Sequence, residues 1–362
     1  MKLGIITFYC SHNYGAMLQA YGLQEFLKRE GHEVYVIDFK PKYKIDAYKR
    51  RSTRYWLSRN PKMCVKHLID YLRTLKKRDK RWFTFNDFME THLSLYPYYR
   101  GMDFHEFDAI FIGSDQVWSP YHTGGWFDDI MFGVGAKCNV ISYAASCTAT
   151  SLNEQQKDYF FHHLDNMVSI SVREESLKNM LQPLTKHKIS IVLDPTLLAG
   201  VGVFDKIANI ATREKPYVVI YEIIGHQQVH TIAESIAKQL DAEILELKNS
   251  ISNRHGDSSI KDDASPEEFL GYIKNAACVV TTSFHGTAFS ILFQRPFYMV
   301  LQNSAADNRM VSLLEKIGLQ DRMISMNERP TMSIPDYTLA NQKMEQLVKE
   351  SEEFIHKSLK LN

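Results

Sequence analysis

Short apolar runs alternate with helical patterns along most of the chain, and this alternation predicts an α/β fold. In the first half the strand-like runs are "KLGIITF", "EVYVIDF", "FDAIFIG", "NVISYAAS" and "VSISVRE". The segment after the first run, "GAMLQAYGLQEFLKREG", has apolar residues at helical spacing, and Gly31 is placed to end that helix. Continuous apolar strands that are each paired with a helix indicate a parallel sheet covered on both faces.

The same pattern restarts after residue 188, which predicts a second domain. Its strand-like runs are "ISIVLDPTLL", "PYVVIYEII", "AEILEL", "ACVVTTS" and "PFYMVL", and one of its helices opens with a capping box formed by Ser265 and Glu268. We therefore expect Rossmann-like domains at 1–188 and 189–335, with "LDPT" at Asp194 marking the passage between them.

The last segment, 336–362, has the pattern of a long charged helix that packs back on the first domain. A chain of 362 residues exceeds what one core usually serves, which agrees with two domains. Two such domains facing each other enclose a central cleft at the carboxyl ends of their strands, where open α/β sheets bind ligands.

Composition excludes several classes of protein. Hydrophobic residues make up 44% of the chain and charged residues 23%, as in ordinary globular proteins. The five cysteines are scattered without a CxxC pair, and the adjacent His162 and His163 would point about 100° apart on a helix, so we expect neither a disulfide framework nor a metal site. "MKLGIITFYC" reads as a first strand rather than a signal peptide, and no apolar stretch approaches the roughly 18 residues of a membrane span. We expect a cytoplasmic protein.

The segment 40–82, a helical insertion in the first domain, is strongly basic. Between Lys40 and Arg81 there are sixteen Lys or Arg residues and three acids. Opposite the basic face, apolar residues recur at helical spacing: Val65, Leu68, Ile69, Leu72 and Leu75. Such a helix either packs its apolar stripe on the domain or attracts anionic membrane, or a phosphorylated lipid-linked substrate, at the inner face of the membrane. No nucleic-acid motif accompanies the charge, so we do not expect nucleic acid as a partner.

Polar residues follow several strands of the first domain directly. His12 and Asn13 in "YCSHNYGAM" precede Gly15 at a helix start, where backbone amides can approach an anion, although an ordinary turn has the same residues. Asp115 in "FIGSDQVWSP" is placed to bind or deprotonate a sugar hydroxyl, or to cap a helix. Arg173 in "SVREES" has a fork that suits carboxylate or phosphate, or an ion pair with its acidic neighbours.

A histidine stands at the corresponding position of the second domain, in "TTSFHGTAFS". His285 would lie at a helix N-terminus, where Gly286 permits close approach and Ser283 and Thr287 can donate to an anion; a purely structural histidine is the alternative. Together the strand ends describe a cleft with a positive end and a hydroxyl-binding end. The positive end comprises Arg173, His285 and Arg309. The hydroxyl-binding end comprises His12, Asn13 and Asp115.

With these motifs in this order the sequence resembles the polysaccharide pyruvyl transferase family. The similar segments are "TFYCSHNYGAMLQAYGLQ", "FIGSDQVW", "SYAAS", "SVREESL", "VLDPTLL" and "TTSFHGTAFSILFQRPF". The resemblance implies a GT-B-like fold, phosphoenolpyruvate as donor without a further cofactor, and as acceptor a sugar of a surface polysaccharide or of its polyprenyl-linked precursor. The product would be a pyruvate ketal, with phosphate released.

The resemblance also implies roles for individual residues. Arg173 and His285 match positions that contact phosphoenolpyruvate in relatives, so His285 is expected to be the general acid and Arg173 to hold the donor, while Asp115 orients or deprotonates the acceptor. The donor side is then the second domain and the acceptor side the first. Some relatives carry an Arg where this chain has Ser283, and we expect Arg309, Arg295 or a helix N-terminus to replace that cation.

Two other functions fit the same residues. A nucleotide-sugar-dependent glycosyltransferase of the GT-B type would share the two-domain cleft. A non-catalytic sugar- or anion-binding relative would keep the cleft with an incomplete donor site, as Ser283 allows.

Overall fold

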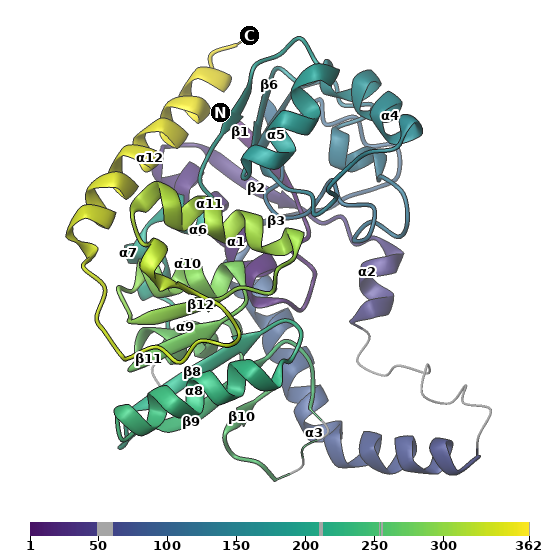
Figure 1. Cartoon of the computed structure of the whole chain (residues 1–362). Helices are drawn as coiled ribbons and strands as arrows, with labels where there is room; N and C mark the ends of the chain where they lie inside the picture. The colour runs from purple at the N-terminus through teal and green to yellow at the C-terminus, as the bar shows by residue number, and fades with distance from the viewer. Residues whose placement is uncertain (49–60, 210–212, 253, 255, 362) are drawn as a thin grey trace.

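The computed structural model describes residues 1–48, 61–209, 213–252, 254 and 256–361. Within these ranges the strands form two sheets, with the orders β3-β2-β1-β4-β5-β6-β7 and β10-β9-β8-β11-β12-β13. Every pairing in both sheets is parallel, and each sheet sets its first strand beside its fourth, as Rossmann domains do. The predicted fold class of two Rossmann-like domains is confirmed (Figure 1).

The strands are short, and those at the centre of each sheet are buried along their whole length, as a sheet covered by helices on both faces requires. The first sheet contains β1 (Lys2–Ile6), β2 (Glu33–Ile37), β3 (Leu95–Tyr96), β4 (Ala109–Ile112), β5 (Asn139–Ala145), β6 (Ser169–Val172) and β7 (Ile189–Ile191). The second contains β8 (Tyr217–Glu222), β9 (Glu243–Lys248), β10 (Ile260–Lys261), β11 (Cys278–Thr281), β12 (Phe297–Val300) and β13 (Met323–Ile324).

Helices connect the strands, and the capping box predicted at Ser265 and Glu268 is present at the start of α9. The helices are α1 (Tyr14–Arg29), α2 (Lys42–Ala47), α3 (Pro61–His92), α4 (Glu154–Leu164), α5 (Glu175–Leu181), α6 (Pro195–Ala199), α7 (Val201–Asp205), α8 (Gln227–Gln239), α9 (Pro266–Lys274), α10 (Phe284–Leu292), α11 (Asn308–Ile317) and α12 (Tyr337–Ser358). Short 3₁₀ turns are η2 (Asp129–Phe132), η3 (Gln182–Leu184), η4 (Ala305–Asp307) and η5 (Gln320–Arg322).

The boundary between the domains lies later in the chain than residue 189. Strand β7 pairs with β6 in parallel, so it is the last strand of the first sheet, and the expected start of the second domain at 189 is wrong for this strand. A three-residue apolar strand carries no sign of the sheet to which it belongs, because only the pairing decides this. The chain leaves the first sheet at "LDPT", where Asp194 caps α6.

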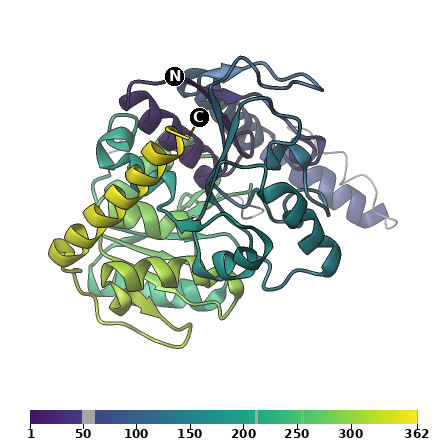
Figure 2. The ribbon, with the colours of Figure 1, turned by 90° about the horizontal axis from the view of Figure 1, so that it is seen from above.

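The C-terminal helix returns to the first domain as predicted. In Figures 1 and 2, α12 runs from the second domain towards the N-terminus of the chain. The backbone N–H of Leu193 donates to Ser351 Oγ (2.9 Å), His356 pairs with Glu30 (2.8 Å), and the amide of Asn139 donates to the carbonyl of Leu361 (2.9 Å). At the start of α12 the hydroxyl of Tyr337 donates to the carbonyl of Arg295 in the second domain (2.7 Å), so the helix fastens the two domains together along one side.

One apolar core extends across both domains. The largest cluster of buried apolar residues joins α1 and β1 of the first domain to α9 and α10 of the second. A second cluster packs on the other face of the first sheet, and a third on the other face of the second sheet. At its centre the rings of Tyr14 and Phe269 stack with their centroids 4.4 Å apart. The core fixes the relative position of the domains.

Helix α3 belongs to the predicted basic insertion, of which residues 49–60 lie outside the described residues. The N-terminal part of α3 extends away from both domains in Figures 1 and 2. Its C-terminal part packs between them, where Lys77 pairs with Asp262 (2.8 Å) and His92 with Glu267 (3.2 Å).

Candidate active site

A cavity of about 570 Å³ is lined by loops from both domains. The first domain contributes residues after β1, β2, β4 and β5, and the second contributes residues after β8, β11 and β12. In each sheet these loops include the point between the first and fourth strands where the strand order reverses, the usual ligand site of open α/β sheets. The expected central cleft is thus present.

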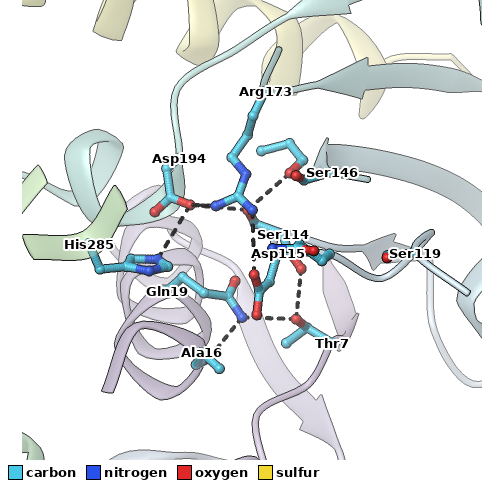
Figure 3. A network of polar contacts seen from close by, with 12 residues as sticks. Thr7, Ala16, Gln19, Ser114, Asp115, Ser119, Ser146, Arg173, Asp194 and His285 are labelled. Atoms are coloured by element: carbon cyan, nitrogen blue, oxygen red, sulfur yellow. Dashed lines mark hydrogen bonds and ion pairs between the residues drawn. The ribbon is translucent and has the colours of Figure 1, made fainter. Parts of the chain in front are cut away.

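A buried arginine links the two carboxylates beside this cleft. Arg173 Nη1 donates to Asp194 Oδ2 (2.5 Å), and Nη2 donates to Asp115 Oδ1 (3.4 Å), as Figure 3 shows. The side chains of Arg173 and Asp194 are 2% and 0% exposed. The other oxygen of Asp194 accepts from the N–H and hydroxyl of Thr196 at the start of α6. Thr196 therefore holds the carboxylate of Asp194 in place, and this carboxylate in turn holds the guanidinium of Arg173.

Asp115 is ionised at any physiological pH. Burial raises the pKa of its carboxyl. The electrostatic effects of Arg173 and Arg309, and of His285 and His122 when these are protonated in acid, outweigh burial and bring the pKa to about 2. Its backbone is in the left-handed region (φ 71°), held by a hydrogen bond from the N–H of Ser146 to its carbonyl (3.0 Å). The carboxylate stays negative and keeps one orientation.

His285 lies in the first turn of α10, which Ser283 caps by accepting from the N–H of Gly286 (3.5 Å). Its Nε2 is buried without a hydrogen-bond partner, 3.9 Å from Asp194 Oδ2. Burial lowers the pKa of the imidazole below 6.5; Asp194 and Asp115 oppose this shift, and Arg173 and Arg309 add to it. His285 is therefore neutral near pH 7.

Arg309, in the first turn of α11, brings a second, half-buried guanidinium to the cleft. Its Nε has no hydrogen-bond partner, and Phe284 lies near both arginines, with its ring centroid 5.8 Å from Arg309 Cζ and 5.1 Å from Arg173 Cζ. Glu174 lies within their field, and burial raises the pKa of its carboxyl despite them. A donor atom without a partner in a cleft is available to an anionic ligand.

Comparison with known protein families shows which family the chain belongs to. The signature described as polysaccharide pyruvyl transferase matches residues 13–304, which include the cleft loops after β4, β5, β8 and β11. The chain belongs to the polysaccharide pyruvyl transferase family. No curated protein sequence matches it. Among the described residues, no helix has the length and apolar character to cross a bilayer.

Solved structures similar to this pyruvyl transferase family member include glycosyltransferases and epimerases. The glycosyltransferase SnogD from Streptomyces nogalater is 11% identical, with 100% of this chain and 98% of that chain covered, at a TM-score of 0.41. A putative UDP-N-acetylglucosamine 2-epimerase from Listeria monocytogenes is 9% identical, with 99% and 89% covered, at 0.45. UDP-GlcNAc 2-epimerase from Neisseria meningitidis bound to UDP-GlcNAc is 10% identical, with 100% and 95% covered, at 0.43.

The structure gathers five of the residues proposed from the pyruvyl transferase motifs around the cleft. Asn13, Asp115, Ser283, His285 and Arg309 all line it. Asn13 also caps α1, since its side chain accepts from the N–H of Ala16 (3.2 Å).

The structure places the other proposed residues elsewhere. The ring of His12 stacks between Tyr48 and Phe85, and burial together with Arg81 lowers its pKa to about 4. The hydroxyl of Thr287 is buried against Met310, 3.8 Å from the sulfur.

Gly286 serves packing rather than ligand access, because a Cβ there would lie 2.3 Å from Thr281 Oγ1. Arg173 lines an adjoining cavity of about 370 Å³. Arg295 lies beyond the C-terminal end of α10, where its Nε donates to the carbonyl of Phe293 (3.1 Å).

Three charged or titratable residues of the site were not among the site residues predicted from the sequence. Lys44 of α2 and His122 both line the cleft, and burial lowers the pKa of each while Asp115 raises it. Asp194 was predicted only as the passage between domains. Its position directly before Pro195 at a helix start was a signal for a helix cap, and the cap is what holds it beside Arg173.

One group with metal-ligand geometry exists among the described residues, formed by Glu222, His230 and Glu246. Glu246 also pairs with Lys248 and Arg254. The charge of Glu246 is therefore balanced by side chains, and the described residues of the cleft itself do not form such a group.

Proposed function

We propose that the protein transfers the enolpyruvyl group of phosphoenolpyruvate to two hydroxyls of a sugar in a surface polysaccharide or its lipid-linked precursor, forming a pyruvate ketal and releasing phosphate. Membership of the family supports a transferase that acts on polysaccharide. The observation that carries the proposal is that Arg309 and His285 of the second domain line one cavity with Asp115 and His122 of the first. An anion and a polyol can meet there.

The donor's anionic groups fit the second-domain wall of the cleft. Arg309 supplies the cation that Ser283 does not, and the first turn of α10 adds backbone N–H groups with the positive end of a helix dipole. Arg173 has an indirect role, because it holds Asp115 and Asp194 in position. The reaction needs no cofactor or metal besides this donor, which as a metabolite of the cytoplasm also places the reaction there.

His285 is the proposed general acid. Its lowered pKa leaves it neutral near pH 7, but the carboxylate and phosphate of a donor favour its charged form, so donor binding raises its pKa and brings a proton to the ring. The imidazolium then protonates the methylene carbon of the donor, which becomes a methyl group, and the central carbon becomes cationic. Asp194, 3.9 Å from Nε2, stabilises the charged ring before this step.

The acceptor hydroxyl then attacks the central carbon. With a pKa of about 2, Asp115 is a weak base, so its role is to accept the hydroxyl's hydrogen bond and orient it. His122, whose pKa burial lowers, is neutral and takes the proton. Phosphate leaves with the electrons of its bond to carbon. The second hydroxyl then attacks the same carbon and gives its proton to His285, which became neutral in the first step, and this closes the ketal.

The test is release of inorganic phosphate from phosphoenolpyruvate with a panel of sugars and lipid-linked sugars as acceptors. His285→Ala should lower acceptor-dependent release by about 10²-fold or more while the circular dichroism spectrum stays native. His162→Ala, which removes an exposed histidine of α4, is the control and should keep full activity. Near-normal release by His285→Ala would overturn the acid assignment. Turnover of a UDP-sugar without response to phosphoenolpyruvate, or saturable donor binding without turnover, would overturn the reaction.

A further inference from the structure

The N-terminal part of α3 exposes a stripe of apolar side chains. Met63, Val65, Ile69 and Leu72 are 42%, 57%, 42% and 56% exposed. Val65, Ile69 and Leu72 are four and three residues apart, so they lie on one face of the helix. The interpretation in which this stripe packs on the domain is wrong for these residues.

The exposed part of α3 has a rigid base. Further along the same helix, Lys77 pairs with Asp262, and Arg81 donates to carbonyls of both domains. Figures 1 and 2 both show the preceding turns extending beyond the body of the molecule. An apolar stripe carried on an anchored helix, at the periphery of the molecule, can meet an extended surface without any change in the fold.

The charge of the same segment selects the kind of surface. Between residues 61 and 76 the sequence has Lys62, Lys66, Arg73 and Lys76 against one acid, Asp70. Exposed apolar side chains beside lysine and arginine match a lipid interface, because the apolar groups enter the acyl boundary while the basic groups meet anionic headgroups. A nucleic-acid backbone satisfies the charges but offers nothing to Val65, Ile69 and Leu72.

We propose that the N-terminal part of α3 docks the protein on an anionic membrane surface. The helix lies along the interface with its apolar stripe inserted about 5–10 Å into the headgroup and acyl boundary. This is a peripheral contact, in keeping with the absence of a spanning helix among the described residues. The docking does not depend on the proposed ketal chemistry, since no residue of the stripe lines the cleft.

Sedimentation with vesicles tests the docking. The full chain should bind vesicles of phosphatidylcholine mixed with phosphatidylglycerol, bind vesicles of phosphatidylcholine alone much more weakly, and lose affinity as salt rises. The variant Val65→Asn/Ile69→Asn/Leu72→Asn should lose at least about 10-fold in affinity. Arg73→Gln/Lys76→Gln should lose about 5-fold for each charge removed.

Phe161→Asn is the matched control, because it removes an equally exposed (57%) apolar side chain from α4. This variant should bind like the original chain, and all variants should keep native circular dichroism and the same thermal midpoint. Unchanged vesicle binding by the triple variant, or equal binding to neutral vesicles, would overturn the proposal. So would binding of RNA or DNA that these substitutions weaken while vesicles are not bound.

Discussion

His285 gives the cleft a pH dependence whose sign follows from its burial. Its pKa lies below 6.5 in the free protein, so only acidic conditions charge it before the donor binds. If the imidazolium starts the reaction, kcat/KM falls as pH rises through that lowered pKa. The bound donor raises the pKa, so kcat falls only at higher pH. Rate profiles of phosphate release against pH should show these two separated limbs.

The same proton is measurable without turnover. Calorimetric titration with phosphoenolpyruvate in buffers of different ionisation enthalpy should show proton uptake near pH 7, and His285→Ala should abolish that uptake. Asp115 cannot imitate the effect, because its pKa of about 2 keeps it ionised throughout. Donor binding without proton uptake would contradict the acid role of His285.

At the scale of single residues, the sequence was enough to predict which residues follow an apolar strand and so lie near the cleft. It was not enough to predict the direction in which each side chain points. Asp115 and His285 were found because a strand end fixes their position. His12 follows a strand as well, yet its ring packs between aromatic side chains 36 and 73 residues away in sequence, Tyr48 and Phe85. His122 stands in a loop after Pro120, and no local pattern marks it as a cleft residue.

At the scale of elements, the site depends on close contact between α1 and the second domain. The ring of His285 rests on Gly15, where an added Cβ would lie 2.0 Å from Nδ1. Two turns further along α1, a Cβ on Gly22 would lie 2.8 Å from the carbonyl of Pro195 in α6. The sequence predicted both helices but not their contact, just as it predicted β7 without its sheet, because pairing between distant segments leaves no local pattern.

This contact predicts the effect of one methyl group. Gly15→Ala should displace the imidazole and lower phosphate release by about 10²-fold, since a shift of about 1 Å at a reacting group has that cost. The free energy of unfolding should fall by about 1–3 kcal/mol through overpacking. Gly202→Ala, within α7, is the control, because no atom lies within 4 Å of a Cβ there. It should keep full activity, and the free energy of unfolding should not fall, since alanine favours the helix over glycine. Full activity of Gly15→Ala would show that the position of the His285 imidazole does not affect the reaction, which would contradict the prediction.

At the scale of the whole molecule, one guanidinium holds the two domains to α3. Arg81 is 6% exposed, and it donates to the carbonyl of His12 (2.9 Å) and the hydroxyl of Tyr14 (2.9 Å) in the first domain. In the second domain it donates to three carbonyls, those of Lys248 (3.3 Å), Asn249 (3.1 Å) and Asp262 (3.1 Å). A charged, forked donor can satisfy acceptors from two directions at once.

Arg81→Met should therefore destabilise the molecule far more than its loss of volume suggests. Methionine leaves buried carbonyls of both domains without donors, and hydrogen bonds to a charged group contribute about 1.5–3 kcal/mol each, so we expect the free energy of unfolding in urea to fall by at least about 3 kcal/mol. Arg81→Lys should recover only part, since an ammonium lacks the planar fork. Arg73→Met, at an exposed position of the same helix, should change stability by less than about 0.5 kcal/mol. Equal urea midpoints for Arg81→Met and Arg73→Met would show that the shared apolar core alone holds the domains together.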